Sequence, residues 1–166
     1  MFRKIEDFVD EWHHERTDTL RLLRSLTDAS LSTRVTDEGR SLGRLAWHVA
    51  LSVAEILSHA GLPIESLSQE APVPATASAI ADRYELDSAA AEAALRIRWH
   101  DSMLDKEVPM YGELWRRGKV LSVLIRHQSH HRGQMTVLMR QAGLPVIGVY
   151  GPAREEWSAL GMPAMD

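Results

Sequence analysis

Cysteine is absent from this chain of 166 residues. Its absence excludes disulfides, thiolate nucleophiles and every metal site that needs a cysteine ligand, so a bound metal would have to use histidine and carboxylate side chains. An excess of positive charge is also lacking, because 19 lysines and arginines stand against 23 aspartates and glutamates, for a net charge of −4. The chain has no overall positive field to attract polyanions, and we expect no nucleic-acid partner.

Long apolar runs are missing as well. No stretch approaches the roughly 20 apolar residues of a membrane-spanning helix, and the first ten residues mix charged and apolar side chains, unlike a signal peptide. We therefore expect a cytoplasmic protein with no membrane partner. The length and the content of 45% hydrophobic and 25% charged residues are typical of a soluble globular protein. We expect one domain over residues 1–166.

Apolar residues recur at helical spacing in four segments. These segments run from near Phe2 to Leu26, from about Leu42 to Ala60, from Thr76 or Ser78 to about Met103, and from Lys119 to Ala142. Between the second and third segments, residues 61–77 carry three prolines and no period, which indicates a long surface crossover. Residues 104–118 could hold short extended pieces, and the tail could hold one short helix near residues 155–160. The pattern predicts an all-α fold, a four-helix bundle with a long crossover connection.

Histidine is the residue type that is used out of proportion, with eight in the chain. His127 and His131 lie one helical turn apart and differ by about 40° around the helix, so they share a face with apolar residues. Burial disfavours charged imidazole, and each neutral ring still needs partners for its nitrogens. A divalent ion such as zinc or nickel would bind neutral imidazole nitrogen at this spacing. Buried histidines that are hydrogen-bonded to carbonyls are the alternative.

His48 is the natural third ligand, because it lies at the edge of the apolar stripe of the second predicted helix, with Ser52 and Glu55 on the polar side of that helix. A boundary histidine with an exposed ring is the alternative interpretation. His59 lies about 16 Å further along the same helix and cannot share an ion with His48. The remaining histidines outside the 127–131 run are expected to be solvated; they are His13, His14 and His100.

Four motifs in this order resemble the DinB family, whose superfamily also includes YfiT-like and bacillithiol-transferase-like proteins. The motifs are Ser41-Leu-Gly-Arg-Leu-Ala-Trp-His48, His127-Gln-Ser-His-His-Arg-Gly-Gln134, Gly143-Leu-Pro145 and Tyr150-Gly-Pro152. The resemblance implies a four-helix bundle in which one histidine of the second helix and a histidine pair of the last helix hold a divalent ion. Carried over to this chain, the metal ligands are His48, His127 and His131.

Three further residues lie within these motifs or near His48. Gln128 stands where many relatives have a carboxylate, which puts any role of that carboxylate in doubt for this chain. Gln134 matches the family run and is a candidate to orient a ligating ring through a hydrogen bond, with a simple helix-packing contact as the alternative. Glu55 is a candidate base or outer-sphere group near His48, with a solvated helix carboxylate as the alternative. The sequence identifies no catalytic residue.

Three neutral histidines would leave the ion with its full charge and with an open position, where it lowers the pKa of a bound water or thiol. For some family members, the resemblance implies metal-dependent transfer of a low-molecular-weight thiol to a small electrophilic substrate. Our first hypothesis is a metal-dependent enzyme acting on small molecules, a thiol S-transferase or a related transferase or hydrolase. The second is a metal-binding or small-ligand-binding stress-response protein that catalyses no reaction.

Two interaction hypotheses remain. The family's damage-inducible name and six basic residues near the last helix raise DNA binding, but these charges are spread around the helix instead of forming one stripe. The six are Arg116, Arg117, Lys119, Arg126, Arg132 and Arg140. A homodimer is expected, because five tryptophans exceed what a small core must hold and because family members are often dimers.

Overall fold

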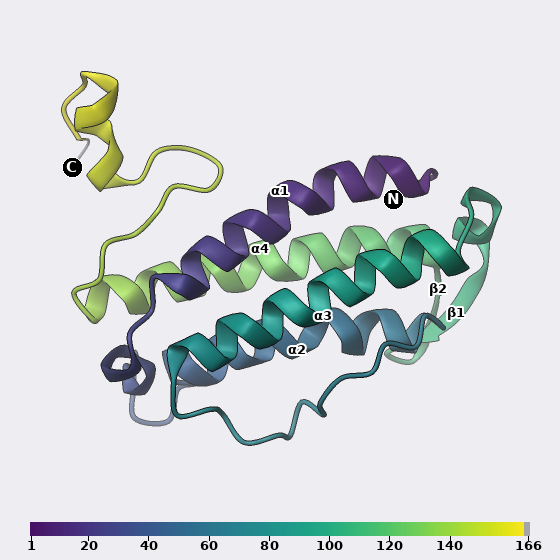
Figure 1. Ribbon diagram of the computed structural model, residues 1–166, viewed down its shortest axis with the longest axis horizontal. Helices are drawn as coiled ribbons and strands as arrows, with labels where there is room; N and C mark the ends of the chain where they lie inside the picture. The colour runs from purple at the N-terminus through teal and green to yellow at the C-terminus, as the bar shows by residue number, and fades with distance from the viewer. Residues whose placement is uncertain (165–166) are drawn as a thin grey trace.

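Four long α-helices dominate the computed structural model, which describes residues 1–164 (Figure 1). They are α1 (Ile5–Arg24), α2 (Leu42–His59), α3 (Ala77–Arg98) and α4 (Arg117–Gln141). Short 3-10 helices span Asp28–Ser32, Asp101–Asp105 and Arg154–Leu160, and a hairpin pairs β1 (Glu107–Met110) with β2 (Glu113–Arg116) in antiparallel register. The predicted all-α four-helix bundle is confirmed. None of the helices in residues 1–164 has the length and apolar composition that a membrane crossing needs.

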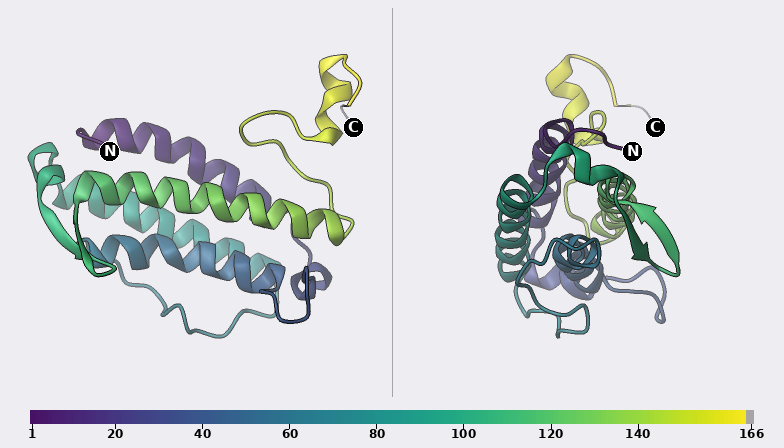
Figure 2. Two further views of the ribbon diagram at one scale, coloured as in Figure 1. Left: turned by 180° about the vertical axis from the view of Figure 1, so that it is seen from behind. Right: turned by 90° about the vertical axis from the view of Figure 1, so that its right-hand side faces the viewer.

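The order of the helices around the bundle follows from their contacts. Both α1 and α2 pack against α3 and α4, so the order is α1, α3, α2, α4, as the end-on view in Figure 2 shows. The long connection between α2 and α3 runs back along the bundle, so these two helices are parallel (Figure 1). Its place in residues 60–76 confirms the predicted crossover. As a result, α2 and α4 lie side by side and antiparallel, which is the arrangement that forms the histidine cluster.

Side-chain caps fix where two helices begin. The Ser41 hydroxyl accepts a hydrogen bond from the N–H of Arg44 at 3.1 Å, as predicted. At the start of α3, the Thr76 hydroxyl accepts one from the N–H of Ala79 in the same way. The predicted end of the third helix near Met103 is wrong, because α3 stops at Arg98. Trp99 has extended backbone angles and a buried indole, over which the Arg117 guanidinium lies at 4.4 Å from the ring centroid. Because the chain leaves the helix at this point, the indole of Trp99 reaches the core. Periodicity in the sequence does not reveal the stabilisation that this burial gives.

The hairpin fills the irregular region before α4. Tyr111 and Gly112 form its two-residue turn, and both have positive φ angles, of 52° and 85°. Positive φ at both central residues matches the right-handed twist of the flanking strands, and glycine adopts it without steric cost. The short extended pieces expected in this region are therefore present as β1 and β2.

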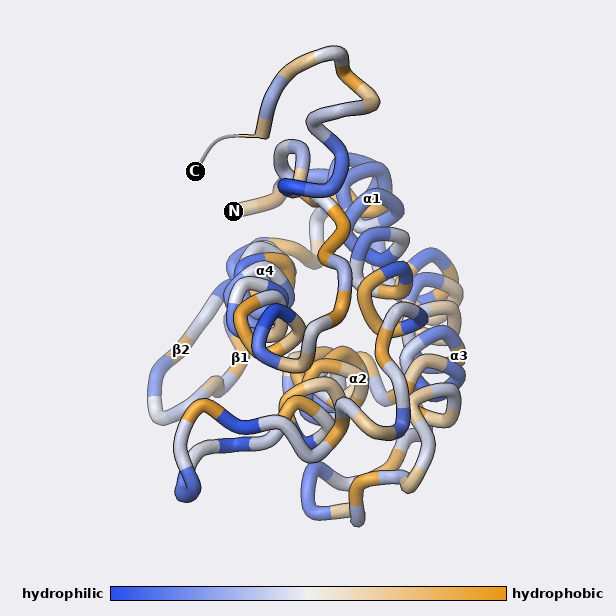
Figure 3. The backbone as a smooth tube through the Cα atoms, turned by 90° about the vertical axis from the view of Figure 1, so that its left-hand side faces the viewer, coloured by the Kyte–Doolittle hydropathy of each residue, from blue (hydrophilic) through white to orange (hydrophobic). Residues whose placement is uncertain are grey.

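The core is centred on α2, most of whose tube is coloured as hydrophobic in Figure 3. Three of the five tryptophans belong to this core, with exposed fractions of 1% for Trp12, 2% for Trp47 and 6% for Trp99. The other two, Trp115 and Trp157, are half-buried, so the number of tryptophans alone gives little support for self-association. The expected homodimer stays a prediction.

Two polar residues are more buried than their helical angles predict. Ser52 was expected on a polar face but is fully buried, and Arg132 was expected beside the buried stripe but is only 2% exposed. Arg132 forms an ion pair with buried Glu15 of α1 and donates to the Thr19 hydroxyl at 2.8 Å. The Tyr150 hydroxyl of the tail contacts both charged groups. Arg132 is thus an internal cross-link and is unavailable to a nucleic acid.

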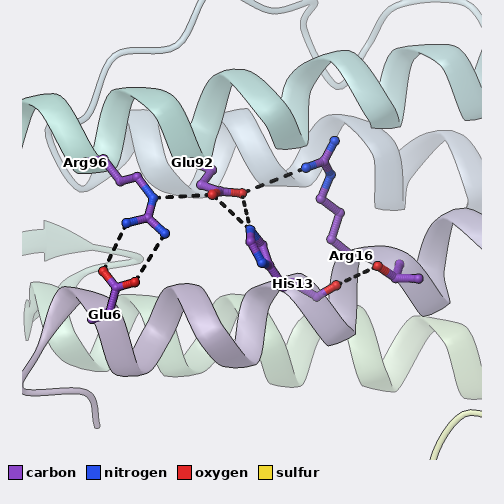
Figure 4. A network of polar contacts seen from close by, with 6 residues as sticks. Glu6, His13, Arg16, Glu92 and Arg96 are labelled. Atoms are coloured by element: carbon purple, nitrogen blue, oxygen red, sulfur yellow. Dashed lines mark hydrogen bonds and ion pairs between the residues drawn. The ribbon is translucent and has the colours of Figure 1, made fainter.

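A second polar network lies on the outside of the bundle, between α1 and α3 (Figure 4). Glu92 accepts from His13 at 2.9 Å and from Arg96 at 3.3 Å, and Arg96 also pairs with Glu6. His13 is exposed, as expected, although its ring is paired. Largely exposed ion pairs of this kind contribute about 0–1 kcal/mol each, so the network adds little to the stability of the fold.

Candidate metal centre

Three histidine rings converge between α2 and α4. His48 comes from the middle of α2, and His127 and His131 come from successive turns of α4. Their Nε2 atoms form a nearly equilateral triangle, with 3.1 Å between His48 and His127, 3.2 Å between His48 and His131, and 3.1 Å between His127 and His131. The ring planes are inclined by 66° to 89°, so the rings meet by their edges and do not stack. His131 is buried and the other two rings are half-buried.

Two glutamines hold two of these rings from behind. The Oε1 atom of Gln69, in the crossover, lies 2.9 Å from Nδ1 of His48, and the Oε1 atom of Gln134 lies 2.7 Å from Nδ1 of His131. The Gln69 amide nitrogen donates to the His48 carbonyl at 3.5 Å, which orients its oxygen toward the ring. An amide oxygen only accepts hydrogen bonds, so both Nδ1 atoms must carry the proton. The Nε2 atoms of His48 and His131 therefore present lone pairs to the centre of the triangle.

This donor set fits a divalent cation, and the three rings cannot satisfy all of one another's hydrogen-bonding groups. With two lone pairs already facing the centre, His127 can donate its one proton to only one of them. Its Nδ1 atom is buried and has no hydrogen-bond partner among residues 1–164. A cation would satisfy all three Nε2 atoms at once, and nitrogens at 2.0–2.1 Å from a tetrahedral ion are themselves separated by about 3.3 Å. The observed separations are within a few tenths of an ångström of that value.

Burial and neighbouring positive groups favour the neutral form of the two α4 rings, His127 and His131. Burial lowers the pKa of His127 to about 3, and the nearby rings and Arg40 act in the same direction. Burial also lowers the pKa of His131, which the hydrogen bond to Gln134 partly opposes. Neutral imidazole is the form that binds metal, so the environment of the cluster favours ligation over protonation at neutral pH.

The other candidate residues take different places. Glu55 makes no side-chain hydrogen bond to the three rings in the described part of the chain. Its charge acts on the hairpin instead, where burial and then the Glu55 carboxylate raise the pKa of the Tyr111 hydroxyl. Gln128 is fully buried and donates from Nε2 to the Val49 carbonyl at 3.2 Å and to the Ser52 hydroxyl at 3.1 Å. Gln128 therefore joins α4 to α2, and neither of these bonds involves the three histidine rings. His59, His14 and His100 are exposed.

Gln69 is the residue of the centre that sequence reasoning missed. It lies in a segment with no periodicity, where no local pattern marks one polar residue above its neighbours. The structure shows what fixes it: Arg44 donates to the Gln69 carbonyl at 2.7 Å, and the indole of Trp47 donates to the Ala71 carbonyl at 3.1 Å. These bonds attach the crossover to the face of α2 that carries His48.

Comparison with known proteins agrees with this architecture. The chain is 44% identical to the uncharacterized protein YrdA of Bacillus subtilis (strain 168) over 164 residues, which is 99% of this chain and 98% of YrdA. The crystal structure of a DinB-like protein from Bacillus cereus ATCC 10987 superposes with a TM-score of 0.87 at 43% identity, covering 90% of this chain and all of that one.

More distant structures share the fold. YfiT from Bacillus subtilis, described as a probable metal-dependent hydrolase with an unusual four-helix bundle topology, gives a TM-score of 0.66 at 17% identity, over 85% of this chain and 89% of YfiT. The DinB-like protein YjoA of the same organism gives 0.67 at 15% identity, over 89% of this chain and 99% of YjoA. The sequence pattern of the DinB family matches residues 1–164, and the chain belongs to this family.

Proposed function

We propose that this protein is a divalent-metal-dependent enzyme that acts on a small molecule, by transfer of a thiol or by a related transfer or hydrolysis. The observation that carries the proposal is the triangle of Nε2 atoms of His48, His127 and His131, with sides of 3.1–3.2 Å. The description of YfiT, which shares the fold, as a probable metal-dependent hydrolase supports the same class.

The ligand set determines what chemistry is available. A divalent ion bound by three neutral imidazoles would keep its charge and an open position, and it would supply Lewis-acid activation of a water or a thiol there. The ion would be held by His48, His127 and His131. Gln69 and Gln134 would fix two of these rings, because their Oε1 atoms accept hydrogen bonds from Nδ1 of His48 and of His131. The chain contains no cysteine, so in a thiol transfer the thiol would come from the cosubstrate. We propose zinc or nickel, the borderline ions that imidazole suits.

Metal content tests the site directly. We expect about one ion per chain in the purified protein by elemental analysis, and loss of that ion in His48→Ala and in His131→Ala. His59→Ala is the matched control, because His59 lies on the same helix as His48 but is exposed and remote from the cluster. Equal metal content in all four proteins would refute the metal site.

Activity is tested with the same variants. Metal-loaded protein should consume a low-molecular-weight thiol in the presence of a small electrophile, or hydrolyse a small ester or amide, and His131→Ala should lose this turnover. Normal turnover by His131→Ala would exclude the proposed mechanism. The non-catalytic alternative is favoured by one observation, that no carboxylate belongs to the cluster within residues 1–164. Tight metal binding without turnover across these substrates would support it.

A further inference from the structure

A cavity of about 290 Å³ adjoins the metal centre on one side. Its walls include four apolar side chains and the polar side chains of Arg40 and Gln134. The apolar ones are Val35, Leu45, Val137 and Leu138. Gln134 belongs to both places, because it lines the cavity and its Oε1 atom accepts a hydrogen bond from Nδ1 of His131 at 2.7 Å. A molecule in this cavity would therefore lie against Gln134, one hydrogen bond away from the ring of His131.

The apolar part of the cavity is open to solvent. Val35 is 62% exposed and Val137 is 53% exposed, which places them among the large apolar residues that the fold leaves uncovered. Leu45 and Leu138, by contrast, are buried. Apolar side chains at the mouth and at the base would both contact a short apolar chain, and small-molecule sites are commonly built in this way.

Arg40 supplies a positive charge at the wall of this cavity. It is exposed, and among residues 1–164 its guanidinium forms no ion pair within 4.0 Å and no hydrogen bond. It lines the same cavity as Gln134, whose side chain contacts the ring of His131, so it lies on the side of the metal centre that this cavity occupies. No carboxylate lines the cavity in the described structure. With a divalent ion on three neutral ligands, this region would carry a positive charge that attracts an anionic ligand.

We propose that the substrate is a small anionic molecule with a short apolar part, and that Arg40 binds its charged group while the cavity holds the apolar part. This inference rests on the proposed function, because it names the substrate class of the same site. A guanidinium pairs with carboxylate or phosphate oxygens through two parallel hydrogen bonds, so either group would serve. Arg40 is thus the residue that selects anionic substrates over neutral ones.

Calorimetric titration of the zinc-loaded protein with hexanoate, hexyl phosphate and hexanamide tests the proposal. The first two probes distinguish the anionic group, and the amide is nearly isosteric with the carboxylate but uncharged. We expect the anionic probes to bind at least about tenfold more tightly than the amide, the effect of one charge-assisted hydrogen bond. In Arg40→Gln this preference should fall about tenfold, and Arg40→Lys should keep part of it.

Arg98→Gln is the matched control, because it removes one exposed positive charge at the end of α3, outside the residues that line the cavity. It should bind all three probes as the wild type does. A wild type without preference for the anions, or a preference that Arg40→Gln retains in full, would overturn the inference, since in the second case the ion alone selects the anion. Zinc content is measured on the same samples, and the titrations are repeated on metal-free protein. Absence of zinc binding would refute the proposed function, while the Arg40 dependence would still be measured in the metal-free form.

Discussion

The side-chain oxygen of Gln69 lies 2.9 Å from Nδ1 of His48, although Gln69 belongs to an irregular crossover and His48 to the middle of a helix. This contact fixes the ring of His48 and directs its Nε2 lone pair toward the two histidines of α4. The crossover is therefore part of the candidate metal centre as well as a connection between helices.

Removal of this hydrogen bond should weaken metal binding without unfolding the protein. In Gln69→Ala we expect zinc affinity to fall about 10- to 100-fold, the usual effect of losing a residue that orients a metal ligand. A competitive titration with a chromophoric chelator measures the affinity. Glu70→Ala changes the adjacent exposed residue of the same loop and should leave the affinity unchanged. Equal affinity in the Gln69 variant and the wild type would mean that His48 needs no support.

Gln134→Ala separates orientation of His131 from helix packing. The Gln134 side chain is exposed and bonds the ring at 2.7 Å, so we expect about tenfold weaker zinc binding and an unchanged melting temperature of the metal-free protein. Gln141→Ala, an exposed glutamine at the end of the same helix, provides the control. A lower melting temperature with unaltered zinc affinity would favour the packing interpretation.

Gln128→Glu tests whether the fold depends on an amide at this buried position. The buried Gln128 amide donates two hydrogen bonds to α2, and an ionised carboxylate can donate none. We expect a loss of about 1–3 kcal/mol in the free energy of unfolding at pH 7 by urea denaturation. Burial raises the pKa of a carboxyl group, and its protonated form can donate one bond, so the loss should be smaller at pH 5 than at pH 7. A variant as stable as the wild type at pH 7 would show that the two bonds contribute nothing.

The buried pair between Glu15 and Arg132 should be costly to break from one side. Arg132→Ala leaves a buried carboxylate without its cation, and we expect a loss of about 3–5 kcal/mol in the free energy of unfolding. Tyr150→Phe removes only the hydroxyl that contacts both groups and should cost about 1 kcal/mol. Chemical denaturation of both variants gives the comparison. Losses of equal size would mean that the tail hydroxyl, and not the ion pair, stabilises this region.

The half-buried His127 ring predicts how the stability of the metal-free protein depends on pH. Its pKa falls from an ordinary 6.5 in the unfolded chain to about 3 in the folded protein, mainly through burial. Below pH 6.5 the unfolded state binds a proton that the folded state does not, so stability decreases as the pH falls from about 6.5 toward 3. Urea denaturation of the apo protein at intervals across this range should show the decrease, and His127→Gln should show a shallower one. An identical pH dependence of stability in the wild type and in His127→Gln would contradict the lowered pKa of His127.

The sequence by itself determined the helices and one half of the candidate site. Apolar periodicity marks four helices because each must bury one face, and the spacing of His127 and His131 places both rings on the inner face of one helix whatever the rest of the chain does. Local signals such as Ser41 at a helix start also act within a few residues, so they are visible in the sequence.

Only the tertiary structure decided what these elements meet. The distance from His48 to His127 depends on how α2 packs against α4, and the place of Gln69 depends on bonds that hold the crossover to α2. Trp99 leaves its helix, and Arg132 becomes buried, because partners distant in sequence compensate for the local cost. Helical angles fix where a side chain points on its own helix, whereas burial and partnership are properties of the assembled bundle.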